Sequence, residues 1–408
     1  MSEQRPLAKI LSLPVLVVAL GYMVDMYDLF LFTMVRVKSL TDIGVGSDQM
    51  LGTGIYLLNL QMAGLLIGGL VWGILADKRG RLSVLFGSIL IYSLANIANA
   101  FVTTVDQYAI LRLVAGFGLA GELGAGITLV AEILPNKVRG YGTTLVGLMG
   151  LPGSIAAYFV VEIFDWRTSY IVGGVLGLLL LIMRVSVLES GMFSNVKNKN
   201  VRRGDLRLFF ENGRRAVKYV CSILIGFPIW FVVGILITFS PELARALDIT
   251  EPVSAGKAAM LAFSGQVAGN LIAGALSQYM ESRKKVVGLF ILSSLALVFV
   301  YLLVPIGSAD MFYVLCVLLG LCNGYWALFI TVAAELFGTN LRATVATTVP
   351  NFVRGAVIPL TAIFRLLIGP MGTIYSALAT GLLAFVVALV ALRFLEETFS
   401  KDLDYVEE

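Results

Sequence analysis

The strongest constraint in this sequence is a set of apolar runs that are each long enough to cross a lipid bilayer as a helix. A spanning helix needs about 20 mostly apolar residues, because no water is available inside the bilayer to satisfy the backbone. Twelve runs meet that length, at about 12–35, 52–75, 83–103, 108–132, 142–164, 167–188, 218–240, 255–279, 286–305, 310–333, 344–368 and 371–394. The chain is therefore predicted to be an all-α membrane protein with 12 transmembrane helices.

The composition agrees with this prediction. Of the 408 residues, 58% are hydrophobic and only 14% are charged, whereas a soluble domain carries roughly 25% charged residues. A pI of about 8.9 could indicate nucleic-acid binding, but the basic residues lie in the connections between apolar runs. Positive charge in such connections marks the cytoplasmic side of a membrane. We therefore expect a lipid bilayer, and no nucleic acid, as a partner of this chain.

The cations are distributed unevenly between the two sets of connections. One set holds Lys9, the cluster at 78–81, Lys137, Arg139, residues 283–285, Arg342 and Lys401. The other set holds Arg36, Lys38, Arg167, Arg245 and Lys257, together with Asp42, Asp48, Asp106 and Asp310. The first side is cytoplasmic by the positive-inside rule, and an even number of spans places both termini there. Short connections fit a multi-pass protein of a bacterial inner membrane.

A single long connection divides the chain. Residues 189–217 are polar and rich in cations, so we interpret them as a cytoplasmic basic linker. An N-terminal six-helix bundle is predicted over residues 1–188. A C-terminal six-helix bundle with a short cytoplasmic tail is predicted over residues 218–408. We expect a monomer.

The two halves carry traces of a common repeat. Glu132 recurs as Glu335, an offset of 203 residues (335 minus 132), and Arg139 recurs as Arg342 at the same offset. The same acidic and basic pair thus ends the fourth run and the tenth run. Duplicated six-helix halves are the architecture of transporters that rock around a central site. The repeat therefore predicts two pseudo-symmetric six-helix bundles and a transport function.

Neither an enzyme nor a cofactor site is expected. The sequence has no histidine, and no nucleophile–base pair, metal-ligand cluster or phosphate-binding loop is visible. Cys221, Cys316 and Cys322 lie inside apolar runs without metal-ligand spacing, so we interpret them as small buried side chains. A proton relay in this chain has to use carboxylates, with lysine or arginine as modulators.

Charged residues inside the apolar runs indicate a central site, because each costs at least about 2.5–3.5 kcal/mol at the bilayer centre. Asp25 and Asp28 lie near the middle of the first run, and at a spacing of three their carboxylates share one helix face. In the fourth run, Glu122 lies near mid-depth and Arg112 lies closer to the outside. We predict that these four residues couple transport to protons, with Arg112 as a counter-ion. Glu122 could instead form a structural pair with Arg112 or Arg354.

The eleventh run carries the main candidate for substrate binding. Arg354 lies near Asn351, between Pro350 and Pro359, and prolines interrupt helices that line cavities. A guanidinium group there suits a substrate carboxylate or phosphate in a forked contact, although it could also balance the acidic residues. Further substrate contacts are expected from Gln61, Tyr56, Trp230, Gln266, Asn323, Tyr325, Trp326 and Asn351. Packing between helices is the alternative for these residues.

A short basic connection after the second run carries a motif. Gly73, Asp77, Gly80 and Arg81 fill the pattern Gly-x-x-x-Asp-x-x-Gly-Arg, which resembles the loop signature of the major facilitator superfamily. Segments at 112–118, 131–140, 166–167, 189–193 and 397–404 resemble other motifs of that superfamily. The resemblance implies transport by alternating access without a cofactor. It also implies gating by Gly73, Asp77, Arg81, Glu132, Arg139, Glu335 and Arg342.

Two further segments resemble the metabolite:proton symporters of that superfamily. They are Gly21-Tyr-Met-Val-Asp-Met-Tyr-Asp28 in the first run and Gly121-Glu-Leu-Gly-Ala125 in the fourth. The resemblance implies proton-coupled uptake of a small polar metabolite, such as an organic acid, an amino acid or a betaine-like zwitterion. A small-molecule substrate and protons are thus the expected partners. Tyr22, Asp25 and Ala125 depart from the subfamily pattern, which leaves the substrate open.

Three alternatives stay open at this point. Acidic residues at the midplane would also suit a proton-driven exporter of drugs or organic cations, and residues 147–153 form a loose version of an exporter motif. A divalent metal ion could be the transported substrate, held by Asp25, Asp28 and Asn323. A membrane-embedded sensor or enzyme is the third alternative.

Overall fold

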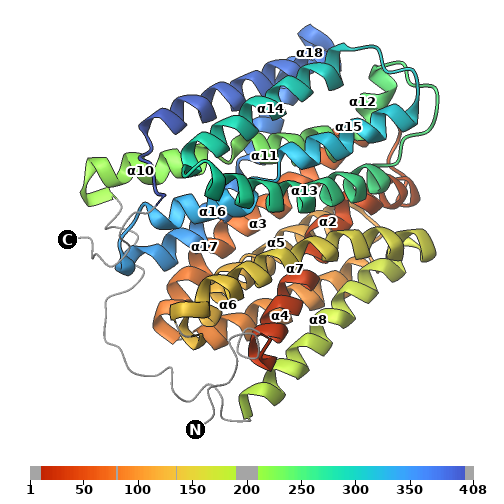
Figure 1. Cartoon of the computed structure of the whole chain (residues 1–408). Helices are drawn as coiled ribbons and strands as arrows, with labels where there is room; N and C mark the ends of the chain where they lie inside the picture. The colour runs from red at the N-terminus through yellow and green to blue at the C-terminus, as the bar shows by residue number, and fades with distance from the viewer. Residues whose placement is uncertain (1–10, 80, 135, 190–209, 400–408) are drawn as a thin grey trace.

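The computed structural model describes residues 11–79, 81–134, 136–189 and 210–399. Within its helices, the side chains at 76–79, 81–82, 128, 131–132, 136–141, 143–144, 186–189, 339–340 and 343 lie outside the description. Every regular element in the described ranges is a helix (Figure 1). The predicted all-α fold is therefore confirmed.

The N-terminal half contains the helices that the first six apolar runs predict, with one run split in two. They are α2 (Leu13–Asp42), α3 (Met50–Arg79), α4 (Arg81–Asn99), α5 (Val105–Leu119), α6 (Glu122–Ile133), α7 (Asn136–Ile163) and α8 (Trp166–Glu189). The fourth run is divided between α5 and α6 at Ala120 and Gly121. Pro14 lies in the first turn of α2, where its missing N–H removes no helical hydrogen bond. Thr104 caps α5 by accepting a hydrogen bond from the backbone N–H of Gln107.

The C-terminal half is more irregular. Its elements are α10 (Gly213–Leu224), α11 (Phe227–Phe231), the π-helix η2 (Val232–Ile237), α12 (Ser240–Ala246), α13 (Ala255–Tyr279), α14 (Arg283–Leu303), α15 (Ala309–Cys322), α16 (Trp326–Glu335), α17 (Thr339–Gly355) and α18 (Val357–Phe394). The seventh run is interrupted after Leu224 and again by η2, and the tenth and eleventh runs are each split. π-Helical turns are rare and are frequent at functional sites.

Ten helical stretches in the described ranges are long and apolar enough to cross a membrane, by length and composition. One of them, Thr344–Phe394, has 51 residues and covers both the eleventh and the twelfth predicted run. It contains Pro370 and a kink at Gly372, whose φ of 73° is left-handed and favours glycine. Ser83–Asn99 is apolar but shorter. A helical fold with many candidate spans is thus confirmed, while the count of twelve stays a prediction.

The helix breaks in the two halves recur at the same spacing as the sequence repeat. The fourth run breaks at Ala120 and the tenth at Asn323, and these positions are also 203 residues apart (323 minus 120). A Cβ added at Gly116 would collide with the backbone of α3, and one added at Gly320 would collide with the backbone of α13. Both halves therefore use glycine to bring the same pair of helices into backbone contact.

The two halves meet along a few helices. In Figure 1 the red-to-yellow helices of the N-terminal half lie beside the green-to-blue helices of the C-terminal half. α13 packs against α2 and α7, and α17 packs against α3 and α6. An added Cβ at Gly124 in α6 would collide with Thr347 in α17, and one at Gly355 in α17 would collide with Leu66 in α3. The residues at the centre of the bundle are therefore enclosed between the halves.

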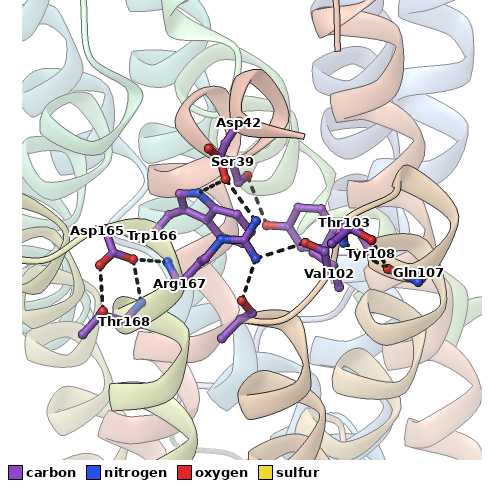
Figure 2. Close-up of polar contacts among 11 residues, drawn as sticks. Ser39, Asp42, Val102, Thr103, Gln107, Tyr108, Asp165, Trp166, Arg167 and Thr168 are labelled. Carbon is purple, nitrogen blue, oxygen red and sulfur yellow. Dashed lines mark hydrogen bonds and ion pairs between the residues drawn. The ribbon is translucent and has the colours of Figure 1, made fainter. Parts of the chain in front are cut away.

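At the predicted outer end, Arg167 joins three helices (Figure 2). Its guanidinium donates to Asp42 at the end of α2 at 3.0 Å. It also donates to the carbonyls of Ala100 and Val102, which follow α4, at 2.8 and 3.1 Å. The indole N–H of Trp166 donates to the same Asp42 oxygen at 3.2 Å. The Trp166-Arg167 segment thus begins α8 and fastens it to its neighbours.

At the opposite end, Glu397 closes the N-terminus of α14. Its carboxylate accepts hydrogen bonds from the Ser282 hydroxyl and from the backbone N–H groups of Arg283 and Lys284, the last two at 2.9 and 3.3 Å. Negative charge is favoured there, because the first turn of a helix has unpaired N–H groups with partial positive charge. Arg283 also pairs with Glu335, at the end of α16, at 2.7 Å. The C-terminal segment is thereby tied to two helices.

These contacts set the pKa of Glu397. Partial burial acts to raise this pKa, but hydrogen bonds from Ser282 and from the backbone N–H groups of Phe399, Arg283 and Thr398 outweigh it, so the pKa lies below its ordinary value. A lowered pKa in the folded state means that the carboxylate stabilises the fold above the ordinary Glu pKa of about 4.3. That stabilisation is lost as the pH falls through the lowered value.

We expect Glu397→Gln to destabilise the purified protein at pH 7.5 by about 1 kcal/mol, in the range of other lost helix caps. The difference should shrink as the pH falls below about 4, because the native carboxylate then becomes protonated as well. Melting curves of both proteins between pH 7.5 and 3.5 measure this. Glu281→Gln, at an exposed carboxylate next to the same helix end, is the control. A difference that stays constant with pH would contradict the assignment.

Candidate functional site

The central residues predicted from the sequence lie beside interruptions in the helices. Glu122 opens α6 directly after the break in the fourth run, and Asn323 follows the last residue of α15. Trp230 lies in the short helix α11. Arg354 belongs to the last turn of α17, shortly before Pro359. Irregular backbone at membrane depth is tolerated where it is buried in protein or lines a cavity, so these breaks fit the predicted place of a central site, which stays a prediction.

One face of α2 packs against the C-terminal half. Met26 lies against Arg354, with 4.0 Å between its sulfur and Nη2. Phe30, one turn further along, packs against Phe263 and Trp230 at ring-centroid distances of 4.1 and 6.1 Å. Residues four apart on a helix share a face. Helix α2 therefore presents a continuous stripe of side chains to the C-terminal half.

Asp25 and Asp28 have no exposed surface. Neither carboxylate makes a hydrogen bond of standard geometry within the described residues, although the side chain of Asn96 lies close to Asp28. Asp25 lies within electrostatic range of Arg354, from the C-terminal half, and Asp28 lies within range of Arg112, from its own half. A buried carboxylate without hydrogen bonds is costly when it is ionised. Within the described residues, no group of three or more histidine, cysteine, aspartate and glutamate side chains is placed to hold a metal ion.

Arg112 in α5 is also fully buried. Its Nη2 donates to Asn96 Oδ1 at 2.9 Å, and its guanidinium carbon lies 5.0 Å from the centre of the Tyr170 ring. Its Nε and Nη1 have no partner in the described part of the chain. A guanidinium group has five N–H donors, so most of this group is still unused. Its counter-ion role toward the aspartates stays a prediction, and the unused donors are compatible with it.

Glu122 forms an ion pair that the sequence reading missed. Both of its oxygens accept hydrogen bonds from Arg184 in α8, one of them at 3.1 Å, and the two side chains are 1% and 5% exposed. An added Cβ at Gly21 in α2 would collide with both groups. The partner of Glu122 is therefore Arg184 and neither of the two arginines considered from the sequence, Arg112 and Arg354, while its role in proton coupling stays a prediction. Arg184 lies inside the sixth apolar run. The free-energy cost of a charge at that depth, which made Arg112 a candidate, therefore also indicates Arg184 as a candidate.

Arg354 is 1% exposed, and no carboxylate in the described ranges lies within ion-pair distance of it. Its Nη1 donates to Asn351 Oδ1 at 3.2 Å, and its Nε has no partner among the described residues. Its guanidinium carbon lies 5.9 Å from the centre of the Trp326 ring. A buried charge without a partner is strongly destabilising. The arrangement therefore favours an anionic ligand with a planar, forked acceptor such as a carboxylate.

Three other predicted substrate residues hold broken helix ends. Asn351 donates to the carbonyl of Ala120, at the break in the fourth run, at 3.1 Å. Tyr325 donates to the carbonyl of Ile225, after α10, at 3.0 Å. Gln266 donates to the backbone carbonyl at the break in the tenth run at 3.5 Å. Interrupted helices leave carbonyls unpaired, and inside a membrane these need protein donors.

The remaining predicted side chains differ in burial. Gln61, Asn323 and Trp230 are buried, with 0%, 1% and 4% exposure, and Trp326 is half-buried. Tyr56 is 46% exposed. The structure therefore brings the first four residues to the enclosed part of the bundle and places Tyr56 apart from them.

The predicted gating residues are described only in part. The side chains of Asp77, Arg81, Glu132 and Arg139 lie outside the described ones. Among the described atoms, none lies within 4 Å of the place where a Cβ at Gly73 would be. Glu335 pairs with Arg283, and Arg342 donates to the carbonyl of Phe337 at 3.4 Å. The gating roles stay predictions.

A second ion pair that the sequence reading missed joins the halves at the predicted outer end. Arg36, which was assigned to a connection, lies inside α2 without exposed surface, because α2 continues to Asp42. Its two terminal nitrogens donate to the two oxygens of Glu242 in α12 at 2.7 and 2.8 Å. Nη2 also donates to the carbonyl of Thr238 at 3.2 Å, and the hydroxyl of Thr238 lies 3.3 Å from that of Thr33. Separation of the halves at this end requires these contacts to break.

We expect Glu242→Ala to destabilise the protein by about 3 kcal/mol, because it leaves a buried guanidinium group without its anion. The double variant Arg36→Met with Glu242→Leu should recover most of that loss, since replacing a buried ion pair by apolar side chains is close to neutral. Melting temperatures of the native protein and both variants measure this. Equal losses in the single and the double variant would contradict the role of the pair.

The family model described as Major Facilitator Superfamily matches residues 18–361 of this chain. The niacin transporter NiaP of Acinetobacter baylyi is 30% identical over 192 residues, which cover 46% of this chain and 43% of that protein. The 4-hydroxybenzoate transporter PcaK of Pseudomonas putida is 26% identical over 325 residues, which cover 70% of this chain and 71% of that protein. The chain thus matches less than half of the niacin transporter and a larger share of PcaK.

Solved structures share the fold. The crystal structure of a D-xylose–proton symporter is similar with a TM-score of 0.70 at 17% identity, over 95% of this chain and 99% of that chain. The inward-open xylose transporter XylE from E. coli gives a TM-score of 0.72 at 15% identity, over 95% of this chain and 97% of that chain. At this identity the similarity concerns the fold alone.

Proposed function

The chain belongs to the Major Facilitator Superfamily, and we propose that it imports an aromatic carboxylic acid together with protons by alternating access. The observation that carries the proposal is Arg354, a buried cation without a carboxylate partner among the described residues, beside the Trp326 ring. A guanidinium group fits a carboxylate in a forked contact, and an aromatic wall fits an aromatic ring. Niacin and 4-hydroxybenzoate, in the names of two relatives, are single-ring aromatic acids.

We further propose twelve membrane spans, with both termini in the cytoplasm, in a monomer of the bacterial inner membrane. Ser83–Asn99 would be a span in addition to the ten candidate stretches. The stretch Thr344–Phe394 would contribute two, because 51 residues of helix extend well beyond the roughly 30 Å of hydrocarbon that one span crosses. Its kink at Gly372 then lies at the turn between them. Residues 189–217 would connect six spans to six.

Proton coupling is proposed to depend on competition for Arg354. When Asp25 is protonated and neutral, Arg354 needs an anion, and the substrate carboxylate supplies it. When the substrate leaves, Asp25 releases its proton and becomes the counter-ion of Arg354 again. Asp28 and Arg112 would form a second proton-binding pair within the N-terminal half. Glu122 would serve as the counter-ion of Arg184, which donates to both of its oxygens.

Arg354→Ala is expected to abolish binding of aromatic acids, and Arg354→Lys to weaken it by about tenfold or more, because lysine keeps the charge but loses the forked contact. Thermal shifts of the purified protein with benzoate, 4-hydroxybenzoate and niacin at pH 5.5 and 7.5 measure this, since a ligand of the folded state raises the melting temperature. Arg365→Ala, at an exposed arginine of α18, is the control. Stabilisation by lipophilic cations instead of these acids would favour the exporter.

Asp25→Asn is expected to separate substrate movement from proton movement, because asparagine resembles the protonated acid and cannot release a proton. In proteoliposomes the variant should still exchange labelled aromatic acid across the membrane. It should lose the accumulation that an inward proton gradient drives in the native protein. An Asp25→Asn protein that still accumulates substrate against its gradient would contradict the proposed role of Asp25.

A further inference from the structure

Beyond Arg354, the two halves build a matched pair of aromatic rings. Phe30 in α2 and Trp230 in α11 stack with their planes 15° apart and their centroids 6.1 Å apart. Phe263 in α13 packs against Phe30 with its centroid at 4.1 Å. All three rings are buried, with at most 4% exposure. Aromatic side chains from opposite halves thus meet one helical turn of α2 away from Met26, which contacts Arg354.

A buried amide donates to the backbone directly before each of the two stacked rings. Gln61 in α3 donates from Nε2 to the carbonyl of Leu29, the residue before Phe30, at 3.3 Å. Asn323, after α15, donates from Nδ2 to the carbonyl of Ile229, the residue before Trp230, at 3.5 Å. Each half therefore holds an amide side chain against the backbone next to one of the stacked rings, although the two amides come from helices that the repeat does not relate.

The oxygen atoms of both amides are unused. Gln61 Oε1 and Asn323 Oδ1 are buried and have no hydrogen-bond partner among the described residues. A buried acceptor without a donor is destabilising, and such atoms are few in folded proteins. Other buried polar side chains at the broken helices, such as Tyr325, have found partners. Two free acceptors beside two stacked rings point to a ligand that brings a donor.

We propose that Gln61 and Asn323 determine specificity by selecting an aromatic acid that carries a hydroxyl or N–H donor on its ring. The proposal rests on the proposed function, in which Arg354 holds the carboxylate. The turn of α2 between Met26 and Phe30 spans about 6 Å, which suits a single aromatic ring between the cation and the amides. A site built to hydrogen-bond a substrate hydroxyl rejects the analogue that lacks it more strongly than an apolar pocket can.

The test compares 4-hydroxybenzoate with benzoate, which differ only in the ring hydroxyl. Calorimetric titration of the native protein at pH 5.5 should show at least tenfold tighter binding of 4-hydroxybenzoate. The ring hydroxyl has one hydrogen to donate, so the leucine variant of the amide that accepts it, Gln61→Leu or Asn323→Leu, should weaken binding of 4-hydroxybenzoate by about tenfold, the effect of one lost buried hydrogen bond. The preference for 4-hydroxybenzoate over benzoate should fall in that variant, because benzoate has no donor for the amide oxygen.

The control is Asn99→Leu. Asn99 Nδ2 also donates to a backbone carbonyl, that of Ala95, at 2.9 Å, and its Oδ1 also has no partner in the described part of the chain. Its helix α4 packs against α3, α5, α6 and α8 of its own half. The same chemical change at this position should leave the preference between the two acids intact.

The possible outcomes separate the two proposals. A preference for 4-hydroxybenzoate that survives in both amide variants would overturn the specificity role. Equal losses for both acids would also overturn it and would leave the amides as supports of the broken helices. A native protein that binds none of benzoate, 4-hydroxybenzoate and niacin would overturn the proposed function itself.

Discussion

The rest of this structure depends on how four arginines are accommodated inside a membrane bundle. Arg36, Arg112, Arg184 and Arg354 are at most 5% exposed, and a buried cation is strongly destabilising unless an anion compensates it. Arg36 and Arg184 each donate two hydrogen bonds to a carboxylate. Arg112 and Arg354 instead donate to the amides of Asn96 and Asn351. The bundle therefore contains two fixed charge pairs and two cations whose compensation can change.

Helix α2 connects these two kinds of charge. Arg36 at one end of it is fixed to the C-terminal half through Glu242, whereas Asp25 and Asp28 near its middle have no hydrogen-bond partner among the described residues. Any rotation of one half against the other changes the distance between Asp25 and Arg354, because they belong to different halves. In the proposed mechanism, the cost of ionising Asp25 would depend on the arrangement of the halves, and by linkage its protonation would bias that arrangement.

The fold could be predicted from the sequence because the backbone of a single membrane-spanning segment has to form its hydrogen bonds within that segment. A long apolar run in this chain is therefore expected to be a helix. The offset of 203 residues likewise reappeared as helix breaks at Ala120 and Asn323. The partners of the buried charges were harder to find. Glu122 and Arg184 are 62 residues apart, and Arg36 and Glu242 are 206 apart. The insertion cost says that a buried charge needs a partner, but only the packing of the helices decides which residue supplies it.

The unsatisfied polar groups near the centre do not all require the same ligand group. Arg354 lacks an anion, Gln61 and Asn323 lack donors, and Asp25 lacks any hydrogen bond in the described structure. A molecule with a carboxylate at one end and a donor at the other would supply the anion for Arg354 and a hydrogen bond to one of the amides, and a proton would neutralise Asp25. Each of these groups is costly when it is buried without a partner. A ligand and a proton that together supply partners to several of them would therefore stabilise the enclosed state more than either would alone. In the proposed mechanism, that difference would be the free energy by which substrate and proton jointly favour the closed arrangement of the halves.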